Sequence, residues 1–172
     1  MSRAPWVKAL VAIAAVGGSA LAFSAPAQAA FAPVNVERSG ATIFVRAGSE
    51  ANGIDLNGSA GSSMTVTDTL VSVTAGAGCQ QLGALVRCST AGVTRVVVTA
   101  GLGNDAVRNN TNIASTLGGG GGFDRLFGGS AADAINGGSG DDILSGGAGS
   151  DTLDGGTGID RCTGEFESNC EL

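Results

Sequence analysis

The chain has 172 residues, a formal net charge of −6, thirty glycines and no histidine. Six phenylalanines, one tryptophan and no tyrosine leave too few large side chains for a conventional compact core, so the composition favours a regular array of small aliphatic residues. The acidic balance argues for cations and against nucleic acid as partners, and the lack of histidine in the sequence excludes zinc-protease motifs and every Ser-His or Cys-His nucleophile pair.

Residues 1–29 have the pattern of a secretory signal peptide. Arg3 and Lys8 give a positive start, residues 9–23 are almost wholly apolar, and Ala27-Gln28-Ala29 offers small residues at a cleavage site. A membrane anchor is the alternative, but this apolar run of 15 residues is shorter than the roughly 20 that a spanning helix needs. We therefore predict a secreted, extracellular protein with cleavage after Ala29, no membrane span after cleavage, and a formal charge of −8 in the mature chain.

Residues 30–99 are rich in short alternating and β-branched segments, which clusters of Gly, Asn and Ser separate. This pattern predicts strands and shows no helical period. Because the run from Val93 to Thr99 enters the next region with no linker, we interpret residues 30–99 as irregular rungs of the repeat structure that follows, or as a small β-cap on it. The segment Ala47–Asp55 (AGSEANGID) is similar to a decayed repeat, but its frame is poor and we assign it no site.

The four cysteines form two close pairs in the sequence, and in an exported chain this even count predicts two disulfides. Three connectivities are possible, of which we expect the local one, Cys79 with Cys88 and Cys162 with Cys170. A zinc site is the competing interpretation, but it needs more ligands than two distant pairs supply. The second disulfide would fold residues 164–172 back as a C-terminal cap with a polar outer surface.

A nine-residue repeat fills residues 100–163. Positions 1, 2 and 4 are Gly, position 6 is Asp and position 8 is aliphatic; five units run in frame from Gly119 to Thr163. Ala100–Arg108 also fits, whereas Asn110–Gly118 keeps only the aliphatic residue. This part of the chain is strongly acidic, since from Gly101 onward there are eleven acidic residues and only three arginines.

Each position that recurs in the nine-residue unit has a physical reason. Glycine permits backbone dihedrals that other residues avoid and leaves carbonyl oxygens free to point at an ion. Aspartate adds a carboxylate, a hard oxygen ligand that suits Ca²⁺ better than a soft transition metal. The three residues after it form a short strand whose middle residue points inward. We expect these inward residues to form one apolar file, the whole core of the repeat region: Val107, Leu117, Leu126, Ile135, Leu144, Leu153 and Cys162.

The unit resembles the hemolysin-type (RTX) calcium-binding nonapeptide repeat, G-G-x-G-x-D-x-U-x, over residues 100–163. The resemblance implies an all-β fold, a parallel β-roll or β-solenoid in which two units make one 18-residue turn. It also implies that Ca²⁺ lies between loops stacked on the same side, so that units n and n+2 share an ion. The implied metal ligands are Asp105, Asp124, Asp133, Asp142, Asp151 and Asp160, with Gly119, Gly120, Gly122, Gly137, Gly138, Gly140, Gly146, Gly147, Gly149, Gly155, Gly156 and Gly158.

This rule sorts the aspartates into two columns. Asp124, Asp142 and Asp160 form one, with Asp105 as a further member, and Asp133 and Asp151 form the other. The two sites that share Asp142 have unbroken glycine frames. The site between Asp133 and Asp151 is weakened by Ala131, a non-glycine residue where a left-handed conformation is expected. The site between Asp105 and Asp124 depends on a degenerate unit with Ser115 at the Asp position. We expect two sites, with four as the ceiling.

The sequence therefore predicts a secreted, non-catalytic calcium-binding β-roll with a structural or surface-interaction role. Without Ca²⁺ the glycine-rich, charged composition favours disorder, so folding and ion binding would be coupled. The alternative is an adhesin or lectin-like module that binds through residues 30–99 and uses the repeats as a calcium-stiffened stalk. A small hydrolase that uses carboxylates alone is the weakest reading. The sequence names no macromolecular partner.

Overall fold

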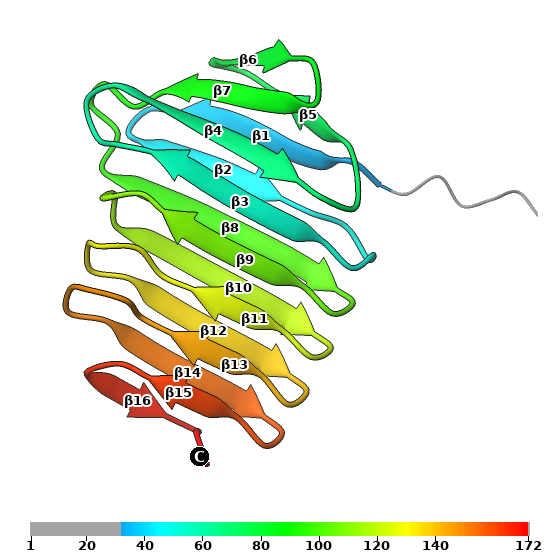
Figure 1. Ribbon diagram of the computed structural model, residues 1–172, viewed down its shortest axis with the longest axis vertical. Coiled ribbons are helices and arrows are strands. Elements are labelled where there is room, and N and C mark those ends of the chain that lie inside the picture. The colour runs from blue at the N-terminus through cyan, green and yellow to red at the C-terminus, as the bar shows by residue number, and fades with distance from the viewer. Residues whose placement is uncertain (1–31, 172) are drawn as a thin grey trace, which may run out of the picture.

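The computed structural model describes residues 32–171, and this part of the chain consists of strands and turns without a helix (Figure 1). No helix in it could therefore span a membrane. The predicted signal peptide lies outside the described residues. One sheet, sheet A, has the order β16-β14-β12-β10-β8-β2-β1-β5. The other, sheet B, has the order β15-β13-β11-β9-β3-β4-β7-β6.

The strands are short, and every second one in the repeat region belongs to the same sheet. Sheet A contains β1 (Val34–Ser39), β2 (Thr42–Arg46), β5 (Val73–Ala75), β8 (Arg95–Leu102), β10 (Ser115–Gly121), β12 (Ala134–Ser139), β14 (Thr152–Thr157) and β16 (Phe166–Ser168). Sheet B contains β3 (Gly53–Gly58), β4 (Ser63–Asp68), β6 (Cys79–Leu82), β7 (Leu85–Ser89), β9 (Ala106–Asn110), β11 (Arg125–Phe127), β13 (Ile143–Ser145) and β15 (Arg161–Thr163).

The repeats wind into two parallel ladders, one in each sheet. In sheet A, Leu117 is paired in register with Ile135 and Ile135 with Leu153. In sheet B, Leu126 is paired with Leu144 and Leu144 with Cys162. Each partner is one turn, or two nonapeptides, further along the chain, as a β-roll requires.

All seven predicted inward residues are buried, but the expectation of a single apolar file was wrong. Because consecutive units belong to opposite sheets, the side chains form two files, one on the inner side of each sheet. A buried leucine contributes about 1.5–3 kcal/mol, so each turn adds only a few kcal/mol of apolar burial. Sheet A supplies Leu117, Ile135 and Leu153, and sheet B supplies Val107, Leu126, Leu144 and Cys162.

The parallel ladders continue into the N-terminal half for one turn. Strand β2 is parallel to β8, and β3 is parallel to β9. Beyond them the pairing of β1 with β2, β3 with β4, and β4 and β6 with β7 is antiparallel. Residues 42–58 thus extend the repeat ladders, and the strands beyond them pair antiparallel except for β5, which is parallel to β1 at the edge of sheet A.

The turn made by Ala47–Asp55 stacks directly on the turn made by Ala100–Arg108. Gly53 is paired with Ala106, and Ile54, which is fully buried, is paired with Val107. The segment Ala47–Asp55 therefore has the frame of a repeat unit, which the sequence alone left doubtful. A long excursion, residues 56–94, separates this unit from the strand β8 on which the next turn begins.

The two disulfides are the expected local ones. Cys79–Cys88 joins the hairpin strands β6 and β7, and Cys162–Cys170 ties the C-terminal segment to β15. Strand β16 in that segment adds to sheet A beside β14, so the segment continues one ladder instead of only covering its end.

Candidate metal centres

All six predicted aspartates are buried, each with at most 3% of its surface exposed. Asp105, Asp124, Asp142 and Asp160 stand in the turns that lead from sheet A to sheet B, and we call them column one. Asp133 and Asp151 stand in the turns that lead back to sheet A, and we call them column two. The two columns therefore run along opposite edges of the roll.

Backbone hydrogen bonds link each aspartate to the turn before it. In column one, Oδ1 of Asp124 accepts from the Asp105 N–H at 2.8 Å, and Oδ1 of Asp142 accepts from the Asp124 N–H at 2.7 Å. The Asp142 N–H donates in the same way to Asp160 Oδ1 at 2.7 Å. In column two, the Asp133 N–H donates to Asp151 Oδ1 at 2.9 Å. Carboxylates of units n and n+2 are thus direct neighbours.

The first glycine of a unit leaves no room for a side chain beside the aspartate. A Cβ on Gly137 would lie 2.4 Å from Asp142 Oδ2 and 2.5 Å from the carbonyl oxygen of Gly155. A Cβ on Gly119 would meet Asp124 Oδ2 at 2.2 Å and the Gly137 carbonyl oxygen at 2.6 Å. A carboxylate oxygen and a main-chain oxygen of the next turn therefore share one small space.

The second and fourth glycines have positive φ angles and lie against carbonyl groups of the turn before. Gly138 and Gly140 have φ of 109° and 122°, a region that favours glycine. A Cβ on them would lie 2.2 Å from the Gly120 oxygen and 1.9 Å from the Gly122 oxygen. Main-chain oxygens are thus stacked along the column together with the carboxylates.

A comparison with protein-family models finds two overlapping matches, residues 116–144 and 127–162, to the model of the RTX calcium-binding nonapeptide repeat (4 copies). The chain contains RTX calcium-binding repeats. Such repeats bind Ca²⁺, so calcium is the cofactor of this region. No curated protein and no solved structure matches the chain. The RTX match does not include the units Ala47–Asp55 and Ala100–Arg108, which stack on it in the same frame.

The oxygen atoms of the RTX columns fit a calcium ion. Within the described residues, Oδ2 of Asp105, Asp124, Asp142, Asp151 and Asp160 is buried without a hydrogen-bond donor. A buried carboxylate oxygen without a partner is unfavourable by several kcal/mol, and a cation removes that penalty. No three acidic or cysteine side chains of residues 32–171 converge on one point, so main-chain carbonyls would have to complete each coordination shell.

The electrostatics of column one also call for a cation. Burial, with the neighbouring charges of Asp105 and Asp142, raises the pKa of Asp124 from 3.8 to about 6, although the Asp105 N–H opposes this. Burial also raises the pKa of Asp105, Asp142 and, in column two, Asp151. Stacked carboxylates in a dry site resist ionisation unless a positive charge compensates them.

Column two departs from the RTX pattern at Ala131, but not for the expected reason. Ala131 does not have a positive φ, so the expected left-handed strain was wrong. Instead this turn has another backbone path, in which the Gly129 N–H donates to Asp133 Oδ2 at 2.6 Å. Oδ2 of Asp133 therefore already has a hydrogen-bond donor, whereas Oδ2 of the other aspartates has none. This makes Asp133 a weaker ligand for an ion.

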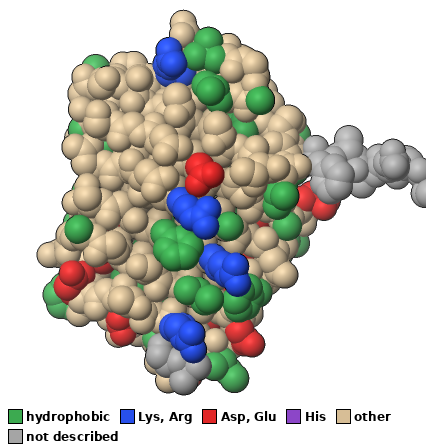
Figure 2. Space-filling model, viewed as in Figure 1, with side chains coloured by type: hydrophobic (Ala, Val, Ile, Leu, Met, Phe, Trp, Pro, Cys, Tyr) green, Lys and Arg blue, Asp and Glu red, His purple; other side chains and the backbone are tan. Residues whose placement is uncertain are grey.

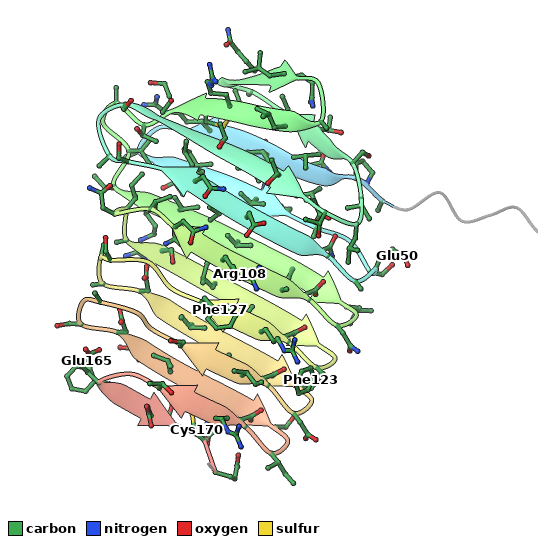
Figure 3. The ribbon with its side chains drawn as sticks, viewed as in Figure 1. Glu50, Arg108, Phe123, Phe127, Glu165 and Cys170 are labelled. Carbon is green, nitrogen blue, oxygen red and sulfur yellow. A yellow bond between two sulfur atoms is a disulfide. The ribbon has the colours of Figure 1, made fainter. Side chains whose placement is uncertain are left out.

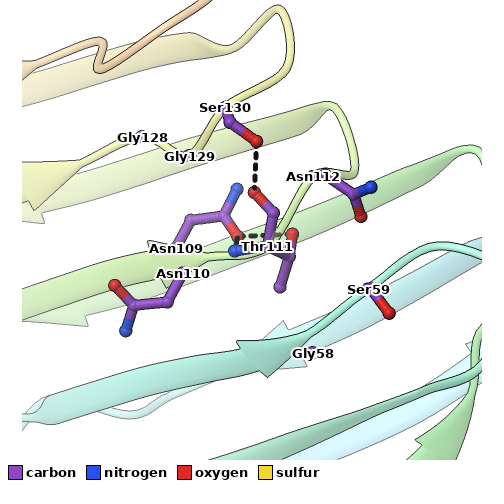
Figure 4. A pocket seen from close by; sticks show the side chains of 9 residues that line it. All are labelled: Gly58, Ser59, Asn109, Asn110, Thr111, Asn112, Gly128, Gly129 and Ser130. Atoms are coloured by element: carbon purple, nitrogen blue, oxygen red, sulfur yellow. Dashed lines mark hydrogen bonds between the residues drawn. The ribbon is translucent and has the colours of Figure 1, made fainter.

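A polar hollow of about 490 Å³ marks the N-terminal end of column two (Figure 4). Its walls include Gly58, Asn109, Thr111 and Ser130. Asn109 Oδ1 accepts from the Thr111 N–H at 3.1 Å and from its hydroxyl at 2.7 Å. Asn109 and Thr111 thus satisfy each other, and none of the side chains that line the hollow has a buried oxygen without a donor, in contrast to column one.

A glutamate of the C-terminal cap lies at the C-terminal end of each column, whereas the sequence predicted only a polar outer surface for this cap. Glu171 Oε2 accepts from the Asp160 N–H at 2.7 Å, and Glu165 Oε2 accepts from the Asp151 N–H at 2.9 Å. Each takes the place of the next aspartate in its column. Their sequence separations of 11 and 14 residues break the 18-residue period, so the repeat pattern does not reveal them.

Proposed function

We propose that the protein is an exported β-roll whose RTX columns fold around Ca²⁺ and then serve a structural or surface-interaction role without catalysis. The observation that carries the proposal is the buried Asp124–Asp142–Asp160 stack, in which every Oδ2 lacks a donor within the described residues. Two disulfides suit export, because disulfides persist in oxidising compartments outside the cytosol.

We assign three ions to column one, between Asp105 and Asp124, Asp124 and Asp142, and Asp142 and Asp160. The first of these sites does not depend on the degenerate unit that contains Ser115. A Cβ on Gly120 or Gly122 would lie 2.0 Å from the oxygen of Gly101 or Gly103, the same arrangement as in the RTX turns that follow. The site between Asp133 and Asp151 is the weakest, because Asp133 Oδ2 already has a donor.

The ions would make folding conditional on the calcium concentration. A ligand that binds only the folded state stabilises it by about 2.7 kcal/mol per site at a hundred times its Kd. Extracellular calcium modules have Kd values of about 10⁻⁴–10⁻³ M, so a chain of this kind remains unfolded in a low-calcium cytoplasm and folds after export. Calcium is in this proposal a compartment signal as well as a structural ion.

The test is far-UV circular dichroism of residues 30–172 with both disulfides formed, first in EDTA and then during a Ca²⁺ titration, with Mg²⁺ as the control ion. We expect a cooperative transition from coil to β structure. Asp142→Ala removes a ligand shared by two sites and should shift the transition to higher Ca²⁺ and reduce its cooperativity. Asp141→Asn is the control, because Asp141 is exposed in the same turn and asparagine keeps the side-chain oxygen that accepts from the Ile159 N–H.

A spectrum that is β-rich in EDTA and unchanged by Ca²⁺ would overturn coupled folding. Equal effects of the two substitutions would overturn the assignment of Asp142. Residues 32–99 give the lectin-like alternative no exposed aromatic ring, because Phe44, the one aromatic residue among them, is half-buried beneath the Arg46 guanidinium, which forms an ion pair with Glu37.

A further inference from the structure

The outer face of sheet B carries a line of arginine and phenylalanine side chains, which we call the Arg–Phe stripe. Figure 2 shows basic and apolar side chains following one another along the middle of this face. In β9, β11 and β15 the exposed arginines alternate with the buried residues Val107, Leu126 and Cys162, so they point away from the core. The stripe consists of Arg108, Phe123, Arg125, Phe127 and Arg161.

The stripe concentrates the positive charge of an acidic region. From Gly101 onward the chain has three basic and eleven acidic residues, and all three basic residues belong to the stripe. Within residues 32–171, none of them has a carboxylate oxygen within 4.0 Å. Even Asp55, the cross-strand neighbour of Arg108, forms no ion pair with it.

Two of the arginines lie over aromatic rings. The guanidinium carbon of Arg108 is 5.7 Å from the centre of the Phe127 ring, two residues that Figure 3 labels. The guanidinium carbon of Arg125 is 5.3 Å from the centre of the Phe123 ring. Such contacts hold the guanidinium group in a defined orientation.

The pair formed by Arg46 and Phe44 is a useful comparison on the other sheet. Its guanidinium stacks in the same way, but its charge is satisfied by Glu37. In the Arg–Phe stripe the positive charges have no such partner in the described part of the chain, and these arginines donate no hydrogen bond there. Arg108 and Arg125 are therefore oriented but unpaired, and Arg161 is unpaired.

We propose that the Arg–Phe stripe binds a linear polysaccharide that carries carboxylate groups. Arginine binds carboxylates through two parallel N–H bonds, and the exposed parts of Phe123 and Ile159 offer apolar surface beside the arginines to a sugar ring. Strands β9 and β15 are three steps apart in the sheet, so the arginines extend over about 14 Å, which suits an extended chain better than a small anion.

The surroundings of Phe123 and the net charge further limit the chemical class of the partner. Shallow hollows of about 240 and 210 Å³ flank Phe123, and each is lined by an arginine and by acidic residues: Arg161 with Asp141 and Asp142 in one, and Arg125 with Asp105 in the other. Nucleic acid carries about one charge per 1.7 Å, and an anionic membrane repels acidic proteins over a broad area. A chain with a net charge of −6 and only three spaced arginines fits a polymer with sparser charges.

This inference rests on the proposed function, because the stripe forms only when the repeats are folded. Binding is therefore measured by calorimetry at a Ca²⁺ concentration at which the circular dichroism spectrum no longer changes. The probes are oligogalacturonates of four to six sugars, a neutral cello-oligosaccharide of equal length, single-stranded oligothymidylate, and phosphatidylglycerol vesicles. If the spectrum proves independent of Ca²⁺, coupled folding fails while the binding comparison still stands.

The decisive comparison is between two double variants with the same change of charge. Arg125→Gln with Arg161→Gln should weaken oligogalacturonate binding at least about tenfold, since two charged hydrogen-bonding groups are lost. Arg87→Gln with Arg95→Gln, two exposed arginines outside the stripe, should leave binding unchanged. Unchanged spectra and calcium midpoints would show that all variants fold.

Three results would overturn the proposal. The first is no binding of oligogalacturonate by the folded protein, or equal binding of the neutral oligosaccharide. The second is an equal loss of affinity in the two double variants. The third is preferential binding of oligothymidylate or of the vesicles, which would assign the stripe to another class of partner.

Discussion

The side-chain nitrogen of Asn52 donates a hydrogen bond to Asp105 Oδ1 at 3.0 Å, across 53 residues of sequence. The same nitrogen donates to the carbonyl oxygens of Glu50 at 2.5 Å and Ala100 at 3.4 Å. Asn52 holds the aspartate position of its turn, and its own Oδ1, like Oδ2 of the RTX aspartates, is buried without a donor. The side-chain nitrogen, in contrast, brings hydrogen-bond donors beside the Asp105 carboxylate, and we infer that these donors take the place of a further ion at this end of column one.

Replacing Asn52 with aspartate should make the first turn dependent on calcium. The new carboxylate would face Asp105 in a buried site and lose the amide donors, which we expect to destabilise the fold by about 3 kcal/mol when Ca²⁺ is limiting. Saturating Ca²⁺ should restore most of that loss by filling one additional site. Urea unfolding at a series of Ca²⁺ concentrations measures this, with Asn52→Ala as the control that cannot bind an ion. The same calcium dependence in Asn52→Asp and the wild type would contradict the role of the amide.

The converse change, Asp142→Asn, should make a middle turn less dependent on calcium. It removes one charge from a column of buried like charges and introduces an amide where Oδ2 has no donor. We expect more β structure in EDTA than in the wild type, equivalent to about 1–2 kcal/mol, and fewer bound ions per chain at saturation. Circular dichroism and equilibrium dialysis measure the two effects. A loss of β structure in EDTA would show that the amide cannot replace the ion.

Lowering the pH should stabilise the calcium-free fold, but it should weaken the binding of Ca²⁺. The pKa of Asp124 is raised to about 6 in the folded chain, against 3.8 when it is exposed, so the calcium-free fold holds this proton more tightly than the unfolded chain does. Its contribution to stability is thus complete below pH 3.8 and is lost as the pH rises through about 6.

In chelator-treated buffer we therefore expect more β structure at pH 4.5 than at pH 7. In the presence of calcium, protons compete with the ion, so the Ca²⁺ midpoint should rise as the pH falls below about 6. Asp124→Asn should reduce both effects. A calcium-free spectrum that loses β structure on acidification would oppose this account.

A single methyl group in the frame should test the packing of the columns. Gly137→Ala would place a Cβ 2.4 Å from Asp142 Oδ2, in the space that we assign to an ion and its ligands. We expect a loss of about 2–3 kcal/mol at saturating Ca²⁺, measured by urea unfolding. Gly121→Ala is the matched control, because its Cβ would approach only side chains, at 3.2 and 3.3 Å, and its φ is not positive. Similar losses in both variants would refute the special role of Gly137.

The sequence was sufficient to predict the columns because their residues obey a strict period. Stacking of Asp124 on Asp142 requires only that both occupy position 6 of units two apart. The same reasoning failed for Ala131, since a backbone can avoid a left-handed conformation by taking another path, and local composition does not reveal this choice. The repeat period did not identify Asn52 as a member of column one either, because residues 56–94 separate its turn from the other repeats. The antiparallel partners of β4 and β7 were also beyond it, since a strand propensity does not specify a neighbour.

The interruption between Asp55 and strand β8 has a consequence for the order in which the molecule assembles. Successive turns of the repeats close loops of 18 or 19 residues, whereas the contact of Asn52 with Asp105 closes one of 53. The longer loop loses about 1 kcal/mol more chain entropy, and the antiparallel strands must also form within it. We therefore expect nucleation in the C-terminal turns and growth towards the N-terminus, so that the half without RTX repeats folds last onto turns that have already formed.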